Sequence, residues 1–202
     1  MLINTVSKKI ISLFFSDNED YPKEVYVYGM SLILTSAITT VFLLIIGVSL
    51  GYFTETILFI MSFSFLRIFT GGLHSRSYIM CNLYTISLFL SAICFYIYLN
   101  DTFNVFLIYG SVLLISIILV KKLAPVENGQ KPIRKEIYLS LKRKAQTVVV
   151  VESIILMISI LLGYTKMRII FPAIVINDVL MIIGFFKNHE RRSSNEKMEH
   201  DD

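Results

Sequence analysis

The chain has 202 residues, of which 55% are hydrophobic and 17% charged, and its mean hydropathy is +0.68. A soluble domain usually has about 45–50% apolar residues; this chain has more, and they occur in long blocks. The basic residues, which give a formal net charge of +4, lie between those blocks, where they determine membrane topology. These features exclude an ordinary soluble domain and do not indicate a nucleic-acid partner. They predict a polytopic membrane protein.

Residues 1–28 precede the first apolar block. In residues 1–15, apolar side chains recur at helical spacing, with Asn4, Ser7, Lys8 and Lys9 opposite them. This pattern is typical of an amphipathic helix that lies in the inner membrane interface. Residues 16–28 are polar and contain Pro22, so we expect a connector there.

Six apolar blocks follow. A hydrocarbon core of ~30 Å takes roughly 20 helical residues to cross, and the blocks fit or nearly fit that length. They predict membrane spans over residues 29–51, 55–70, 79–99, 103–120, 147–164 and 168–186. We therefore expect an all-α fold with about six transmembrane helices over residues 29–186, and a charged, disordered tail over residues 187–202.

The distribution of lysine and arginine predicts the orientation, because these residues collect in cytoplasmic loops. With six spans, 17 of the 19 basic residues fall on one side, and only Lys166 and Arg168 fall on the other. We expect both termini, the short segment between the second and third spans, and the 121–146 loop to face the cytoplasm. The sequence thus predicts a multi-pass protein of the cell membrane.

The 121–146 loop is strongly basic. Its first part holds Pro125, Gly129 and Pro132, which indicate turns. In its second part, residues 133, 137, 141 and 145 are apolar and stand among arginine and lysine residues, which predicts a basic loop helix. That helix could rest on anionic headgroups or could dock an acidic peptide.

The segment between the second and third spans reads RIFTGGLHSRSYIMC over residues 67–81. Gly71 and Gly72 end the second span easily, because glycine accepts left-handed conformations, and Ser75 or Ser77 can cap the third span. Cys81 would then lie in the first turn or two of that span, where free amide groups and the helix dipole favour a thiolate. Two arginines, Arg67 and Arg76, would add to that effect.

His74 lies seven residues before Cys81. In an unbroken helix their Cα atoms would be ~10 Å apart, but a turn at the glycines lets the histidine fold back over the helix start. A histidine beside a cysteine is the minimal arrangement for thiol catalysis, in which imidazole takes the proton and the thiolate attacks a carbonyl. The alternative is that Cys81, like Cys94, is an inert core residue. We expect no metal site and no cofactor, since the histidines and cysteines are too scattered for zinc.

The pattern Arg67-x3-Gly71-Gly72-x-His74-x6-Cys81 resembles the signature of the accessory gene regulator protein B (AgrB) family. The prolines after the fourth span, the chain length and the basic middle loop are similar as well. The family consists of integral-membrane cysteine endopeptidases of quorum sensing. They remove the C-terminal part of a small propeptide and promote cyclisation of the rest to a thiolactone or lactone.

The resemblance implies a role for each residue of the pattern. Cys81 would be the nucleophile and His74 the base, with Arg67, Gly71 and Gly72 supporting the active site in a transmembrane catalytic domain. It also implies a propeptide partner with an acidic C-terminal part, a lipid bilayer around the protein, and a homodimer. The basic residues Lys142, Arg143 and Lys144 are the candidates for binding that acidic part. Ser75 departs from the family, in which many members have alanine at this position.

Asp178 and Asn177 supply a competing interpretation. They lie near the middle of the sixth span with Pro172 close by, and intramembrane carboxylates are functional candidates. They could line a path in a small-molecule or peptide transporter or channel, or they could be hydrogen-bonded packing residues. A third possibility is a structural membrane partner that uses the basic loop as an interaction surface.

Overall fold

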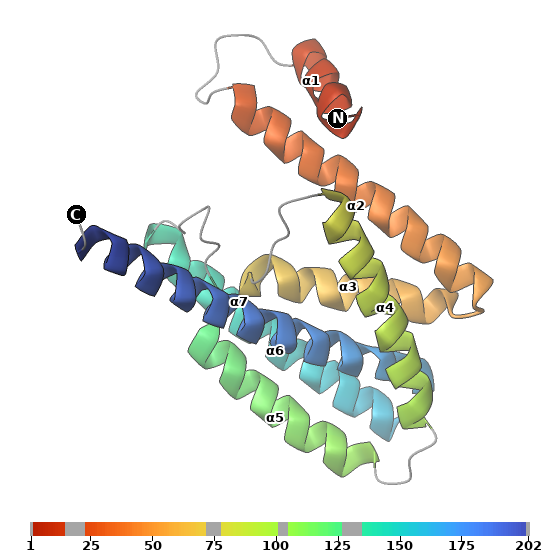
Figure 1. The fold of residues 1–202 in the computed structure, drawn as a ribbon. Coiled ribbons are helices and arrows are strands. Elements are labelled where there is room, and N and C mark those ends of the chain that lie inside the picture. Colours follow the sequence, from red (N-terminus) through yellow and green to blue (C-terminus); the bar gives the residue numbers. More distant parts are fainter. Residues whose placement is uncertain (1, 15–22, 72–77, 101–104, 127–134, 201–202) are drawn as a thin grey trace.

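The computed structural model describes residues 2–14, 23–71, 78–100, 105–126 and 135–200. Within these ranges the chain is almost entirely helical and forms no strand apart from one isolated bridge, which confirms the all-α fold (Figure 1). The elements are α1 (Leu2–Phe14), α2 (Lys23–Ser49), α3 (Phe53–Thr70), α4 (Tyr78–Asn100), α5 (Val105–Leu123), α6 (Lys135–Leu161), the 3-10 helix η1 (Thr165–Ile169) and α7 (Ile170–His200).

Five helices in the described part of the chain are long and apolar enough to cross a membrane. They lie within α2, α3, α4, α6 and the η1–α7 segment. Helix α5 has 19 residues, is free of charged residues from 105 to 120, and packs along α6 and α7. It stays the sixth span that the sequence predicts, and the other five make the chain a polytopic helical membrane protein.

Helices α3, α5, α6 and α7 pack against one another and form the main core (Figure 1). Its interior is filled by large side chains from each helix, among them Leu66, Tyr109, Leu156, Phe171 and Met181. The η1–α7 segment is the most buried of the candidate spans, because it contacts α3, α4, α5 and α6. Most other apolar side chains point outward, as they do in a protein whose solvent is lipid.

Helix α2 packs through a stripe of small and polar residues. Every fourth residue is buried, and most of these residues are small. The stripe consists of Val27, Ser31, Thr35, Thr39, Leu43 and Gly47. It contacts α1 at its start, α4 in its middle and α3 at its end, so a single face of α2 joins three other helices.

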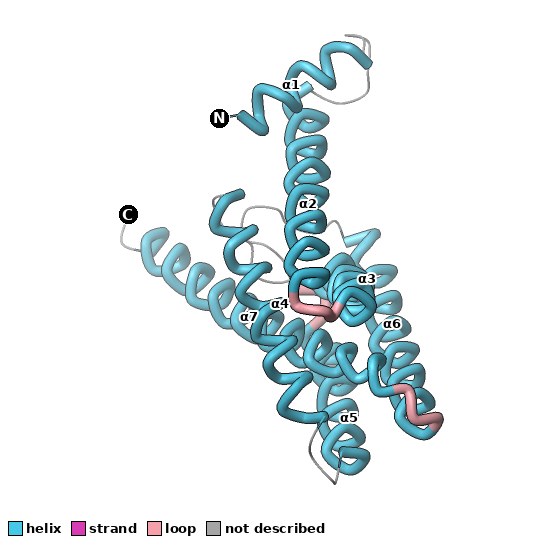
Figure 2. The backbone as a smooth tube through the Cα atoms, turned by 90° about the vertical axis from the view of Figure 1, so that its right-hand side faces the viewer, coloured by secondary structure: helices cyan, strands magenta, loops and turns pink. Residues whose placement is uncertain are grey.

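Helix α1 lies across the start of α2 (Figure 2). Ile11 is buried in the contact, and the hydroxyl of Ser31 donates to that of Ser7 at 2.9 Å. On the opposite side of α1, Val6 and Leu13 are exposed. Ser7, which the sequence pattern places on the polar face of α1, is thus buried against α2, while an apolar face remains exposed; that α1 lies in the membrane interface stays a prediction.

Two boundaries differ from the sequence-based expectations. The basic segment after residue 134 is not a separate loop helix but the first turns of α6, because no proline or glycine interrupts residues 135–161. Helix α7 continues to His200 through the segment that we expected to be a disordered tail. Pro172 lies in the first turn of α7, where it has no helical amide bond to break.

Candidate active site

The chain breaks after α3 at Gly71. The Gly71 amide donates to Arg67 O at 3.2 Å, and Gly71 has φ 68° and ψ −143°. This left-handed conformation is one that residues with a side chain rarely adopt. The glycine therefore ends the helix and turns the chain away from the axis of α3.

Arg67 reaches over this break from the last turn of α3. Its Nη1 donates to the carbonyl oxygen of Gly71 at 2.8 Å, and the side chain is half-buried. The guanidinium also interacts electrostatically with Cys81 on the next helix. One arginine thus links the end of α3 to the start of α4.

The segment that follows α5 packs against Gly71 from the other side. Val126 pairs with Gly71 in a parallel bridge, and its amide donates to Thr70 O at 2.8 Å. A Cβ atom on Gly71 would collide with the Val126 carbonyl oxygen. Ala124, Pro125 and Val126 are buried, with a cis peptide bond between the first two. Residues 124–126, which belong to the segment that resembles the family's proline-containing loop, therefore form a wall that packs against the chain where α3 ends.

Cys81 lies in the first turn of α4, the fourth residue of that helix. Its side chain is half-buried and its thiol is free. The Thr85 hydroxyl donates to Cys81 O at 2.9 Å. Cys94, on the same helix, is also free but exposed, so the chain holds two cysteines in different surroundings.

Asn82, next to Cys81, is held by α2. The hydroxyl of Thr39 donates to Asn82 Oδ1 at 2.7 Å, and Thr39 belongs to the buried stripe of α2. This bond fixes the first turn of α4, and hence Cys81, relative to α2. Nothing in the sequence indicated the pairing, because the two residues are 43 positions apart.

Several residues of the sequence pattern lie outside the described residues. These are Gly72, His74, Ser75, Arg76 and Ser77. The role of His74 as the base, the role of Gly72 and the capping of α4 by serine therefore stay predictions.

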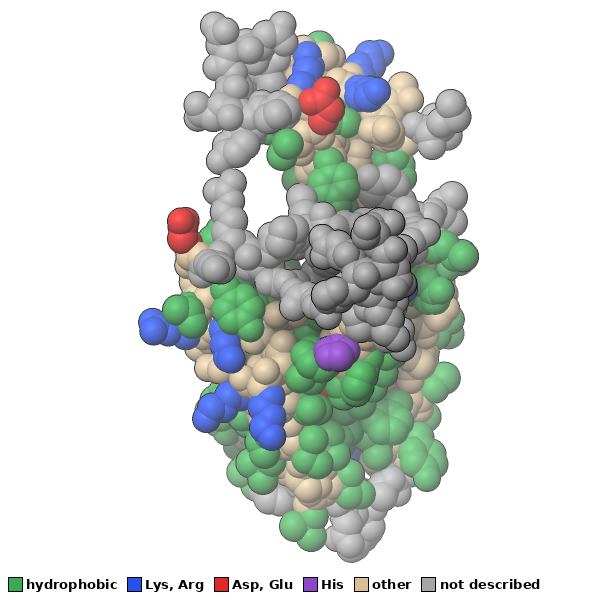
Figure 3. All heavy atoms as spheres, turned by 60° about the vertical axis from the view of Figure 1, so that its left-hand side comes forward, with side chains coloured by type: hydrophobic (Ala, Val, Ile, Leu, Met, Phe, Trp, Pro, Cys, Tyr) green, Lys and Arg blue, Asp and Glu red, His purple; other side chains and the backbone are tan. Residues whose placement is uncertain are grey.

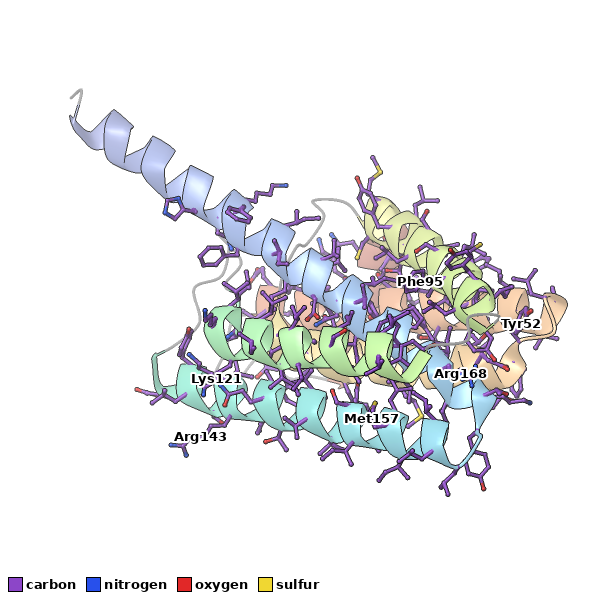
Figure 4. The ribbon with its side chains drawn as sticks, turned by 90° about the horizontal axis from the view of Figure 1, so that it is seen from below. Tyr52, Phe95, Lys121, Arg143, Met157 and Arg168 are labelled. Atoms are coloured by element: carbon purple, nitrogen blue, oxygen red, sulfur yellow. The ribbon has the colours of Figure 1, made fainter. Side chains whose placement is uncertain are left out.

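Basic side chains lie at the same end of the bundle as the break. Lys144 of α6 stands over the Phe69 ring, with its Nζ 5.9 Å from the ring centroid, within the usual range of a cation–π contact. Lys142 is half-buried and Arg143 is exposed. Figure 4 shows Lys121 and Arg143 at one end of the bundle, and Tyr52 and Arg168 at the other.

Asp178 and Asn177 are both buried. The Thr70 hydroxyl lies 3.2 Å from Asn177 Oδ1, so Asn177 touches the last residue of α3. Asp178 interacts with Ser116 of α5, but neither Asp178 Oδ1 nor Ser116 Oγ has a well-formed hydrogen bond within the described residues. The two residues thus face different helices, Asn177 towards α3 and Asp178 towards α5.

Two further buried carboxyl groups escaped the sequence analysis. Glu152 of α6 accepts a hydrogen bond of 2.6 Å from Ser62 of α3. Glu55 lies in the first turn of α3, and its carboxyl oxygen is 3.5 Å from the Tyr96 hydroxyl. An acid inside an apolar block is the signal that could have found Glu152, as it found Asp178.

Comparison with known proteins gives a family match. The family model "Accessory gene regulator B" matches residues 2–185. An AgrB-like protein of Clostridium perfringens (strain SM101, type A) is 31% identical over 141 residues, 67% of this chain and 64% of that protein. AgrB-like protein 2 of Clostridium perfringens (strain 13, type A) is 30% identical over 138 residues, 65% of this chain and 62% of that protein. The chain thus spans less than two thirds of the length of these relatives. No solved structure matches it.

Proposed function

The chain belongs to the accessory gene regulator B (AgrB) family, and we propose that it is an integral-membrane cysteine endopeptidase that processes a quorum-sensing propeptide. It would remove the C-terminal part of the propeptide and promote cyclisation of the remainder to a thiolactone or lactone. The observation that carries the proposal is the position of Cys81, half-buried in the first turn of α4 and within electrostatic range of Arg67, which caps the end of α3.

In the first step, the Cys81 thiolate attacks the scissile carbonyl carbon, with His74 taking the thiol proton. The carbon–nitrogen bond then breaks, the leaving amine accepts that proton from His74, and the peptide remains attached as a thioester. Arg67 would stabilise the negative charge that develops at this centre, because a fixed cation in a partly dry site acts strongly on developing charge.

In the second step, a thiol or hydroxyl group of the bound peptide attacks the thioester carbon. Its proton passes to His74, a new thioester or ester bond closes the ring, and Cys81 leaves as the thiolate. Exchange of one thioester for another changes the free energy little, whereas hydrolysis would destroy the intermediate. Ring closure therefore requires that the thioester be shielded from water. The buried 124–126 wall and the half-buried position of Cys81 support such shielding.

The site would open to the cytoplasm, and both termini would lie on that side. The distribution of basic residues supports this orientation. The substrate would be a small propeptide whose acidic C-terminal part binds near Lys142, Arg143 and Lys144, and the enzyme would act as a homodimer in the cell membrane. The cation–π contact of Lys144 with Phe69, two residues before Gly71, supports a basic surface next to the break.

A cleavage assay in reconstituted membranes tests the proposal. The substrate would come from a short neighbouring reading frame with an acidic C-terminal half. We expect Cys81→Ala, Cys81→Ser and His74→Ala to abolish cleavage, and Cys94→Ala, on the same helix, to retain it. Mass spectrometry of the wild type should show an acyl adduct on Cys81. Cleavage by Cys81→Ala would overturn the proposal.

The alternative, a transporter or channel, rests on Asp178, whose Oδ1 atom is buried without a well-formed hydrogen bond. It predicts that Asp178→Asn abolishes function while Cys81→Ala does not. The same set of variants therefore separates the two functions.

A further inference from the structure

A cleft of about 770 Å³ lies between α1 and the start of α2, away from Cys81 in the chain and in the fold. On the α1 side it is lined by residues 4, 5, 8, 9 and 12, which share one face of that helix. On the α2 side it is lined by residues 23, 24, 27 and 28, again a single face. Both walls are thus regular helix surfaces fixed by the α1–α2 contact.

The contact that fixes the walls is itself well packed. Ser7, which is fully buried, bonds to Ser31, and Ile11 is 2% exposed. Val27 contributes to both this contact and the floor of the cleft. The cleft is therefore part of the fold rather than a chance gap between side chains.

The cleft is basic. Lys8, Lys9 and Lys23 line it, with Glu24 as the one acidic residue among the described residues that line it. Lys8 and Lys9 are exposed, and lysine side chains carry three donors and no acceptor. Figure 3 shows basic side chains together with acidic colouring at the top of the molecule. Such a lining selects an anion.

The remaining face of α1 sets the depth of the cleft in the membrane. Val6 is 45% and Leu13 is 74% exposed, both on the side of α1 that no described element covers. An amphipathic helix buries this kind of face by ~5–10 Å at the boundary between acyl chains and headgroups. The lysine face, roughly a third of a turn away, then lies at the level of the lipid phosphates.

We propose that the α1–α2 cleft binds the phosphate group of an anionic phospholipid from the leaflet on which α1 lies. Lys8 and Lys9 would contact the phosphate from α1 and Lys23 from α2, so the lipid would join the two helices. The site is separate from the peptidase chemistry and does not depend on it.

Native mass spectrometry of the purified full-length protein, titrated with phosphatidylglycerol or phosphatidylcholine, tests the site. We expect one phosphatidylglycerol to bind at least about tenfold more tightly than phosphatidylcholine. Since each basic residue near an anionic surface contributes roughly a fivefold factor, Lys8→Gln with Lys9→Gln should weaken this binding by about 30-fold. Lys8→Arg with Lys9→Arg should preserve it.

The matched control is Lys121→Gln with Lys122→Gln, which removes two exposed lysines at the end of α5 and should leave phosphatidylglycerol binding unchanged. Equal binding of the two lipids, or equal losses in the two glutamine pairs, would overturn the site. Displacement of phosphatidylglycerol by ~1 mM inorganic phosphate would overturn the lipid assignment in favour of a soluble anion.

Discussion

Gly71 combines two constraints, a positive φ and a close contact, that other glycines among the described residues meet one at a time. Gly51 and Gly163 have similar φ angles, 79° and 78°, but open space where a Cβ would stand, whereas Gly71 also faces the Val126 carbonyl. Alanine at a left-handed position costs roughly 1–2 kcal/mol. In Gly71→Ala, the new Cβ should in addition displace residues 124–126, which pack against Gly71. We therefore expect this variant to lower propeptide cleavage by at least about tenfold.

Gly51→Ala and Gly163→Ala are the controls, because they carry the backbone strain alone. Both should retain near-normal cleavage, as measured in the same membranes with thermal unfolding in parallel. If all three alanine variants cleave equally well, the contact between Gly71 and Val126 has no part in the site.

Arg67 is expected to need its guanidinium shape as well as its charge. Its bond to Gly71 O is charge-assisted, a class that contributes about 1.5–3 kcal/mol, and lysine cannot reproduce the planar fork of arginine. Arg67→Lys should therefore lower cleavage by about 10- to 100-fold, and Arg67→Ala by no less.

Alkylation of Cys81 with iodoacetamide shows whether Arg67 acts on the thiol or only on the shape of the break. The measurement uses a Cys94→Ala background, so that Cys81 is the only cysteine. Because a nearby positive charge favours the reactive thiolate, Arg67→Ala should slow the reaction at neutral pH and Arg67→Lys should slow it less. Equal rates in all three proteins would show that Arg67 does not act on Cys81.

Among the helices, α2 depends most clearly on close approach. A Cβ on Gly47 would stand 2.8 Å from Thr56 Cβ of α3, whereas Gly29, earlier in the same helix, has open space. Gly47→Ala should therefore push α2 and α3 apart and lower stability by about 1–3 kcal/mol. Gly29→Ala should be neutral or stabilising by up to ~1 kcal/mol, since alanine is the better helix former.

Thermal unfolding of the two variants in the same detergent compares these effects. The helix-propensity gain is common to both variants, so the difference between them reports the α2–α3 contact alone. A Gly47→Ala protein as stable as Gly29→Ala would show that the two helices do not pack this closely.

The sequence predicts the elements better than the contacts between them. Apolar block length located the long helices, and the glycine pair located the break, because both signals are local. The Gly71–Val126 pairing joins residues 55 positions apart, and the Thr39–Asn82 bond joins two helices. Such contacts depend on how the helices pack, and a single sequence does not carry that information.

The missed continuity of α6 has a different cause. Lysine, arginine and glutamate are good helix formers, so the basic segment 135–146 extends the apolar helix instead of forming its own. The predicted boundary at residue 147 followed the change from basic to apolar residues, but the helix runs through that change. As a consequence, Lys142, Arg143 and Lys144 belong to the first turns of α6 rather than to a separate loop helix, and Lys144 lies over Phe69.

At the scale of the whole molecule, the basic first turns of α6 are the proposed binding surface for the acidic part of the substrate. Substitutions that reverse the charge of this surface test that proposal. Changing Lys142, Arg143 and Lys144 to glutamate should weaken cleavage, mainly by raising KM, because the substrate would meet repulsion where it now meets attraction. In the wild type, cleavage should fall as salt rises, since the screening length shortens from ~30 Å at 0.01 M to ~3 Å at 1 M. The triple glutamate variant should lose most of this dependence of cleavage on salt.

The matched control changes Lys187, Arg191 and Arg192 to glutamate. This triple variant alters the net charge by the same amount and on the same predicted side of the membrane, but far along α7 from the break. It should retain both the wild-type KM and the salt dependence, and accessibility of the termini should confirm that neither variant has inverted in the membrane. If the two triple variants behave alike, the effect comes from overall charge, and the start of α6 is not where the substrate binds.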